Sequence, residues 1–287
     1  MDINSAADAV IAAAARAAGS MAAWRMVARV RLARAGHKGA TGVVLYEGPS
    51  QLPGQSGNIV VIATGTRRPS QNEKTGDMLQ VWIMAQGEEP TAAIKSGADS
   101  AVCGGCKHRR GQGGGCYVVP HQGPLTVYRS WAKGRYPKLT EAATRRLLAG
   151  AHIRFGAYGD PAAVPPHILV PLMAGAKRRT GYTHQWHKAG VEVESVGWLK
   201  PWIMASADTP GEVALAHSLG WRTFRTTLPG EAGLPGEVVC LADSEARPCA
   251  ACGLCNGGDR GKNIRIEVHG GAGMPQRYAA QRAGGAQ

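Results

Sequence analysis

The chain lacks several features that would assign it directly to a class. Its 287 residues contain no uninterrupted apolar run of the roughly 18 residues that a membrane-spanning helix needs. It also has no Walker phosphate loop, no H-E-x-x-H motif and no G-x-S-x-G motif, which excludes several classes of hydrolase. No secretory signal peptide is recognisable. We therefore expect a cytoplasmic protein that has no membrane partner.

Aromatic and acidic residues are scarce. Phenylalanine occurs only 2 times, so the core must rest on aliphatic residues and the 7 tryptophans. Asp and Glu number 20 against 33 Lys and Arg, which leaves a net charge of +13. Such an excess favours anionic partners, so we expect a nucleic acid or nucleotide as substrate or ligand. The 40 glycines indicate a loop-rich α/β protein.

Composition divides the chain into three parts. Residues 1–41 are rich in Ala and Arg, carry one apolar stripe at helical spacing, and form either a targeting segment or an N-terminal extension. Residues 42–270 are expected to form one α/β domain, and residues 271–287 a flexible C-terminal tail.

Short apolar runs closed by Gly, Pro or Asp recur through the domain and predict strands. Several alternate with helical segments such as 209–220, which favours βαβ units and a parallel sheet. We expect a full or partial (β/α) TIM-like barrel, with an open doubly wound sheet as the alternative. The predicted strands are 43–46, 59–63, 79–84, 153–158, 180–184, 202–207, 221–226, 238–241 and 264–269.

Polar side chains follow the carboxyl ends of these strands, where a barrel has its active face. As single residues, Asp160 can instead make a turn before Pro161, and Asp208 can cap the following helix. The same face would present Tyr182, Arg225 and His269. We predict that five residues bind a polar cofactor: Tyr158, Asp160, His184, Ser206 and Asp208.

All seven cysteines belong to two groups. The first comprises Cys103, Cys106 and Cys116 in a glycine-rich stretch. Three thiolates suit zinc or an iron–sulfur cluster, and the site either stays open or takes His108 or His121 as fourth ligand. The neighbouring cations Lys107, Arg109 and Arg110 are expected to lower the pKa values of these thiols.

The second group supplies four thiolates, and it is therefore complete by itself. Three cysteines with two residues between successive ones are typical of bacterial ferredoxins, which favours a [4Fe–4S] cluster, while tetrahedral zinc is the alternative. Disulfides would leave one cysteine over and require an oxidising compartment. The ligands are Cys240, Cys249, Cys252 and Cys255.

A three-cysteine loop after an early strand, a series of βα units and a late four-cysteine group together resemble the radical S-adenosylmethionine superfamily with an auxiliary cluster. The resemblance spans about residues 79–270. It implies that Cys103, Cys106 and Cys116 hold a [4Fe–4S] cluster whose fourth iron binds S-adenosylmethionine and produces a 5′-deoxyadenosyl radical. The spacing here is C-x2-C-x9-C rather than the usual C-x3-C-x2-C.

The chain is also similar to uncharacterised phage-encoded proteins with a KTGDM-like loop, here Lys74–Met78, and the same CxxC segment. That likeness implies no activity. Two functions are thus expected: an iron–sulfur enzyme of radical type, which needs an electron donor and has an unidentified substrate, or a zinc-stabilised basic protein that binds nucleic acid. The latter would use arginine pairs at 67–68, 109–110 and 145–146.

Overall fold

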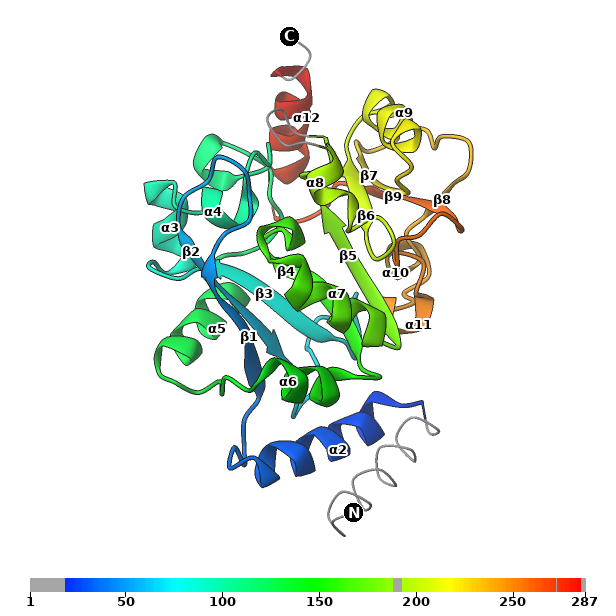
Figure 1. Cartoon of the computed structure of the whole chain (residues 1–287). Coiled ribbons are helices and arrows are strands. Elements are labelled where there is room, and N and C mark those ends of the chain that lie inside the picture. Colours follow the sequence, from blue (N-terminus) through cyan, green and yellow to red (C-terminus); the bar gives the residue numbers. More distant parts are fainter. Residues whose placement is uncertain (1–18, 188–192, 272, 285–287) are drawn as a thin grey trace.

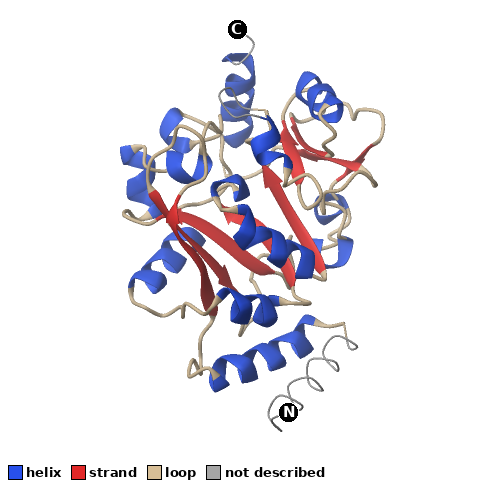
Figure 2. Cartoon of the chain, in the orientation of Figure 1, coloured by secondary structure: helices blue, strands red, loops and turns tan. Residues whose placement is uncertain are grey.

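The computed structural model describes residues 19–187, 193–271 and 273–284. They form a mixed α/β fold around a single nine-stranded sheet in the order β1-β2-β3-β4-β5-β6-β7-β9-β8. Figure 2 shows the strands as a twisted row with helices packed around it. The sheet is mostly parallel and it is not closed.

The strands lie close to the positions that the apolar runs predict. β1 and β2 pair antiparallel, as do β2 and β3, and every later pairing is parallel. β3 is therefore the first strand of the parallel part. The bounds are β1 Gly42–Pro49, β2 Asn58–Thr64, β3 Leu79–Ala85, β4 His152–Tyr158, β5 Arg178–Thr183, β6 Met204–Ala207, β7 Thr223–Thr227, β8 Glu237–Val239 and β9 Asn263–Glu267.

Aliphatic side chains make the core, as the scarcity of phenylalanine requires. The middle of β2 is buried without interruption from Ile59 to Ala63, because both of its faces are covered.

The described helices are α2 Met21–Arg34, α3 Pro90–Ser96, α4 Ser100–Cys103, α5 Gly123–Ala132, α6 Glu141–Leu148, α7 Pro166–Gly175, α8 Val193–Gly197, α9 Pro210–Ser218, α10 Leu241–Ser244, α11 Cys249–Cys252 and α12 Met274–Gly284, with 3-10 turns η1 Arg110–Gln112 and η2 Pro161–Ala163.

The described part of the N-terminal extension is packed against the domain. Ser20 caps α2 by accepting a hydrogen bond from the Ala23 amide, and Trp24 belongs to the main core. The indole of Trp24 donates to the carbonyl of Ala149, and Arg25 pairs with Asp77. The expected helix therefore exists over 21–34, while residues 1–18 lie outside the described residues.

The C-terminal segment differs from the flexible tail that its composition predicts. Residues 274–284 form α12, and its Met274 and Tyr278, one helical turn apart, are both buried. Figure 1 shows α12 beyond the end of the sheet to which β5 points, and α2 near the opposite end. In the described residues, no helix is long and apolar enough to cross a membrane.

Candidate functional site

The first cysteine group lies on a loop that follows β3 and the short helices α3 and α4. Cys103 ends α4, and the chain turns at Gly104, which has a φ of +52°. A Cβ on Gly104 would lie 2.6 Å from the side-chain oxygen of Gln185. The side-chain amide of Gln185 donates to the backbone carbonyl of Cys103 at 2.9 Å. Glycine thus lets the cysteine loop lie against the carboxyl end of β5.

The loop folds back on itself and gathers its three cysteines. The amide of Cys106 donates to the carbonyl of Cys103, and the amide of Cys116 donates to the carbonyl of His108, both at 3.0 Å. The thiol of Cys103 is close enough to interact electrostatically with the other two thiols. Three thiols therefore lie together at the carboxyl end of the parallel strands.

Burial controls the protonation of these thiols. It raises the pKa of Cys103 well above the ordinary value, with a further rise from Cys106 and Cys116, and it raises the pKa of Cys116 to about 11. Burial acts in this direction because it disfavours the charged thiolate. Arg110 does lower the pKa of Cys116, as expected of an adjacent cation, but burial outweighs this effect, and the pKa values of Cys103 and Cys116 are both raised overall.

The adjacent cations have other partners. Arg109 forms an ion pair with Asp99 at 2.5 Å, and Lys107 forms ion pairs with Asp208 and Glu212, both at 2.7 Å. These carboxylates neutralise two of the three cations that the loop carries. The loop is thereby tied to the ends of neighbouring strands and helices.

Asp208, directly after β6, is the centre of a buried polar cluster. Its carboxylate accepts hydrogen bonds from His108 Nε2 at 2.8 Å and from the Tyr278 hydroxyl at 2.5 Å, in addition to the Lys107 ion pair. Burial raises the pKa of Asp208, but the bond to His108 and the charge of Lys107 outweigh it and hold that pKa well below the usual range. Asp208 does not cap α9, because Thr209 does so.

His108 uses only one of its ring nitrogens. Its Nδ1 is buried and has no hydrogen-bond partner among the described residues. The ring stacks on Tyr278 at 5.3 Å and meets His184 edge-on at 5.6 Å. An imidazole that donates one N–H to a carboxylate and leaves the other nitrogen free is the usual arrangement of a metal-ligating histidine. His121, the other candidate fourth ligand, is exposed.

Asp160, after β4, joins two strand ends. Its carboxylate accepts hydrogen bonds from the amide of Ala162 at 3.0 Å and from the amide of His184 at 2.7 Å. The first bond caps η2, so the turn predicted before Pro161 is present. Burial raises the pKa of Asp160. The second bond fixes the backbone at the end of β5.

The other two candidate binding residues lie at the same strand ends. Tyr158 is buried and interacts electrostatically with Cys103, and burial raises its pKa. Ser206 is half-buried, and its carbonyl accepts the indole N–H of Trp186 at 2.7 Å. The five predicted cofactor residues thus surround the carboxyl ends of β4, β5 and β6. Both carboxylates among them already have partners within the chain.

Three further strand-end residues do not join this cluster. The Tyr182 hydroxyl bonds to the thiol of Cys255 in the second cysteine group. Arg225 forms ion pairs with Glu231 at 2.5 Å and Glu237 at 2.7 Å. His269 is exposed. The pattern of strand ends predicts position along a strand, but not the face to which each side chain points.

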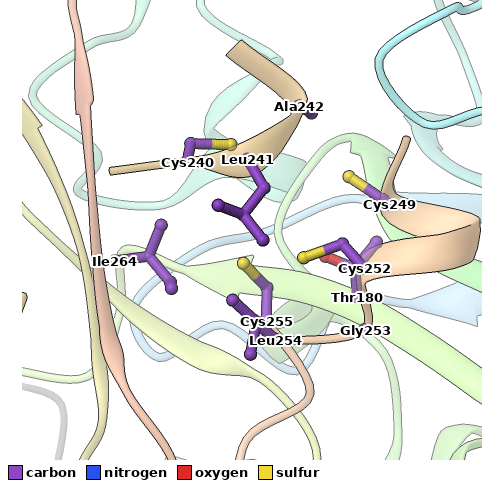
Figure 3. Close-up of a pocket in the computed structure, with 10 residues that line it drawn as sticks. All are labelled: Thr180, Cys240, Leu241, Ala242, Cys249, Cys252, Gly253, Leu254, Cys255 and Ile264. Atoms are coloured by element: carbon purple, nitrogen blue, oxygen red, sulfur yellow. The ribbon is translucent and has the colours of Figure 1, made fainter. Parts of the chain in front are cut away.

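The second cysteine group lines one pocket. Cys240 directly follows β8, Cys249 and Cys252 lie on α11, and Cys255 follows α11. Figure 3 shows their sulfur atoms around a common space, with Thr180 of β5 and Ile264 of β9 among the other lining residues. Burial raises the pKa of Cys249 to about 11, and it raises that of Cys255 further. Four thiols from two separate segments therefore face one another.

The KTGDM-like loop holds this pocket in place. The amide of Cys249 donates to the carbonyl of Lys74 at 2.9 Å, and the amide of Ala250 donates to the carbonyl of Thr75 at 3.1 Å. The Lys74 ammonium pairs with Asp243 of α10 at 2.6 Å. The loop precedes β3, so the second group lies toward the amino ends of the strands, away from the first group.

Neither group is arranged as a finished site for a single ion. In the part of the chain that the structure describes, no three or more His, Cys, Asp or Glu side chains are grouped so that they could hold one metal ion. A mononuclear zinc site needs all its ligand atoms within about 2.0–2.3 Å of one point. A cluster takes each thiolate at a different iron and therefore accepts a wider ring of sulfurs.

Several cations counted in the net charge are not available to nucleic acid. Of the arginine pairs, Arg109 is bonded to Asp99, and Arg145 pairs with Glu141. Arg67 and Arg68 are exposed. The overall excess of positive charge thus overstates the free positive surface.

Sequence reasoning missed two contributors to the first site, Tyr278 and Glu212. Met274 and Tyr278 are four residues apart, which is the sequence spacing of a helix that packs one face, and both are buried in the structure where a tail was expected. Glu212 had no such signal.

Comparisons with family models, with curated proteins and with solved structures find no match to this chain.

Proposed function

We propose that the protein is an iron–sulfur enzyme of the radical S-adenosylmethionine type, in which Cys240, Cys249, Cys252 and Cys255 hold an auxiliary [4Fe–4S] cluster. The observation that carries the proposal is the pocket that these four cysteines line together. Thiolates are the ligands that such clusters take. Cys240 and the segment 249–255 meet there, and the KTGDM-like loop, which is distant in sequence, supports them.

The proposed reactive centre is held by Cys103, Cys106 and Cys116 at the carboxyl ends of the parallel strands. The strands β3 to β7 are neighbours in chain order, as in a (β/α) barrel, which supports a partial barrel with its active face at this end. When bound there, S-adenosylmethionine supplies a radical that removes a hydrogen atom from a substrate. The cysteine loop follows the first parallel strand, β3, only after the short helices α3 and α4, whereas in the superfamily it follows the first barrel strand directly.

The polar residues around this centre have separable roles in the proposal. Tyr158 and Asp160 are buried beside Cys103 and exclude water from it. Asp208 fixes the orientation of the His108 ring, whose free Nδ1 is available to a metal or to a ligand. The ring of His184 and the hydroxyl of Ser206 provide polar contacts for the cofactor.

The proposal also requires partners. A one-electron donor must reduce the reactive centre, and the net charge of +13 favours an anionic substrate such as a nucleotide or nucleic acid. The alternative is a basic nucleic-acid-binding protein with both cysteine groups holding zinc, which the remaining positive charge supports. In that case binding measured across a salt series falls steeply as salt rises.

The decisive experiment is metal analysis after oxygen-free purification and reconstitution. We expect about eight irons per chain with the broad visible absorption of cubane clusters. The double variant Cys240→Ser/Cys255→Ser should lose about half of the iron, and Cys103→Ser/Cys116→Ser the other half. Release of 5′-deoxyadenosine from S-adenosylmethionine on reduction with dithionite should disappear only in the second variant.

Each outcome has a definite meaning. Stoichiometric zinc in place of iron, with an intact cofactor after reduction, refutes the radical enzyme and favours the zinc-stabilised protein. Iron in the second group alone, without cofactor cleavage, refutes the reactive centre but retains the auxiliary one. A serine substitution at a residue outside both groups, such as Ala242→Ser in the lining of the pocket, is the matched control and should keep all iron.

A further inference from the structure

Arginines surround the four-cysteine segment and bind its backbone. Arg222, which is only 7% exposed, donates to the carbonyls of Leu254 at 2.8 Å and Gly257 at 2.7 Å. Arg178 donates to the carbonyl of Ala251 at 2.9 Å. These bonds hold the chain on both sides of Cys255 and bring guanidinium charge close to the thiols.

Arg154 approaches the same pocket from the sheet. It lies on β4 directly beside Thr180 of β5, which is one of the residues that line the pocket. Neighbouring residues in register on parallel strands point to the same face. Arg154 is 9% exposed, bonds to the Tyr117 hydroxyl at 2.8 Å, and interacts electrostatically with the thiol of Cys249.

Within the described residues, neither Arg154 nor Arg222 forms an ion pair with a carboxylate. Arg225, on β7, has the conventional arrangement, because Glu231 and Glu237 neutralise it. Burying a cation without a counter-charge is strongly unfavourable. Both guanidinium groups have hydrogen-bond acceptors, but neither has a counter-charge among the described residues, so a negative charge at this pocket would stabilise both.

The four cysteines provide that charge only when they are bound to metal. As neutral thiols they carry none. Four thiolates around a divalent ion or a [4Fe–4S]²⁺ core carry a net charge of about −2 by simple addition. We infer that Arg154 and Arg222 are the counter-charges of an anionic tetrathiolate centre in this pocket. This inference rests on the proposed function.

The test measures how metal affinity depends on the charge at position 154. Co²⁺ is the probe, because its thiolate complexes absorb visibly, and the full chain carries Cys103→Ser/Cys116→Ser so that only the second group binds. We expect Arg154→Gln to weaken Co²⁺ binding at least about tenfold, because it removes a cation close to a dianion in a region of low dielectric. Arg154→Lys keeps the charge and should retain most of the affinity.

The matched control is Arg225→Gln, which removes a buried arginine that carboxylates already neutralise. It should lower stability to the same extent with and without Co²⁺ and leave the affinity for Co²⁺ unchanged. The Arg154→Gln variant should instead lose stability mainly in the Co²⁺-loaded protein. If Arg154→Gln does not fold, the Gln and Lys variants of the half-buried Arg178 provide the same comparison.

The two possible failures are distinguishable. A parent chain that binds no Co²⁺, zinc or iron at the second group refutes the proposed function. A parent chain that binds Co²⁺ with equal affinity whether position 154 is Arg, Lys or Gln overturns only the role of the arginines. For the iron-loaded protein, a lower reduction potential in Arg154→Gln than in Arg154→Lys is the corresponding expected result.

Discussion

Replacing Asp208 by Asn tests whether the buried polar cluster holds the first cysteine loop and α12 in place. The side chain of Asp208 is 3% exposed, and its carboxylate accepts from His108, Lys107 and Tyr278. Asn keeps the volume but removes the charge, so Lys107 loses its most buried ion-pair partner. Breaking a buried pair by removing one partner costs about 3–5 kcal/mol.

The Lys74–Asp243 pair provides a matched comparison. Its N–O distance is 2.6 Å, comparable to the 2.7 Å of Lys107–Asp208, but its side chains are 44% and 35% exposed. An exposed pair contributes about 0–1 kcal/mol, so Asp243→Asn should change stability by no more than that. The difference between the two variants then arises from burial, since the substitution is the same.

The assay is equilibrium urea denaturation followed by tryptophan fluorescence, with limited proteolysis as a local probe. Asp208→Asn should also expose α12 to protease, because the single side-chain oxygen of Asn cannot accept from His108, Lys107 and Tyr278 together. If Asp208→Asn costs no more free energy of unfolding than Asp243→Asn, or leaves α12 equally protected, the reasoning about this cluster is refuted.

Three other predictions concern separate parts of the fold. Tyr278→Phe should cost about 1–3 kcal/mol, less than Asp208→Asn, because it removes the one hydroxyl proton that Asp208 and the carbonyl of Thr226 share. Urea denaturation measures this loss, and an equal or larger loss would contradict the ranking. Burial and nearby cations lower the pKa of His152 below its unfolded value of 6.5, so the stabilisation should be full above pH 6.5 and fall as the pH drops below it. His152→Asn should remove this pH dependence of the free energy of unfolding, and an unchanged pH profile in the variant would refute the prediction. Gly76 has a φ of +61°, and a Cβ added there would lie 2.7 Å from the Cβ of Pro248. Gly76→Ala should therefore lower both the stability of the protein and the retention of metal by the second cysteine group. Gly54→Ala, at a φ of +68° with open space around it, should cost only the roughly 1–2 kcal/mol of a left-handed backbone and leave metal content unchanged.

Local sequence signals located most elements of the fold. Runs such as 59–63 are apolar throughout, which is the pattern of a strand buried on both faces, and they lie in strands. The helix predicted over 209–220 is present as Pro210–Ser218, with Thr209 as its cap. The antiparallel pairing of β1 with β2 and the helix at 274–284 were missed, because strand direction and helix docking depend on distant partners.

The division of the cysteines into two groups is visible in the sequence, since their spacing is a local property of the chain. So is the position of polar residues at the strand ends. The folded chain alone shows that Lys74 contacts the second group and that Tyr278 bonds to Asp208. It also shows that Arg154 has no carboxylate partner among the described residues. Burial and charge neutralisation are set by residues far apart in the chain, so spacing along the sequence contains no record of them.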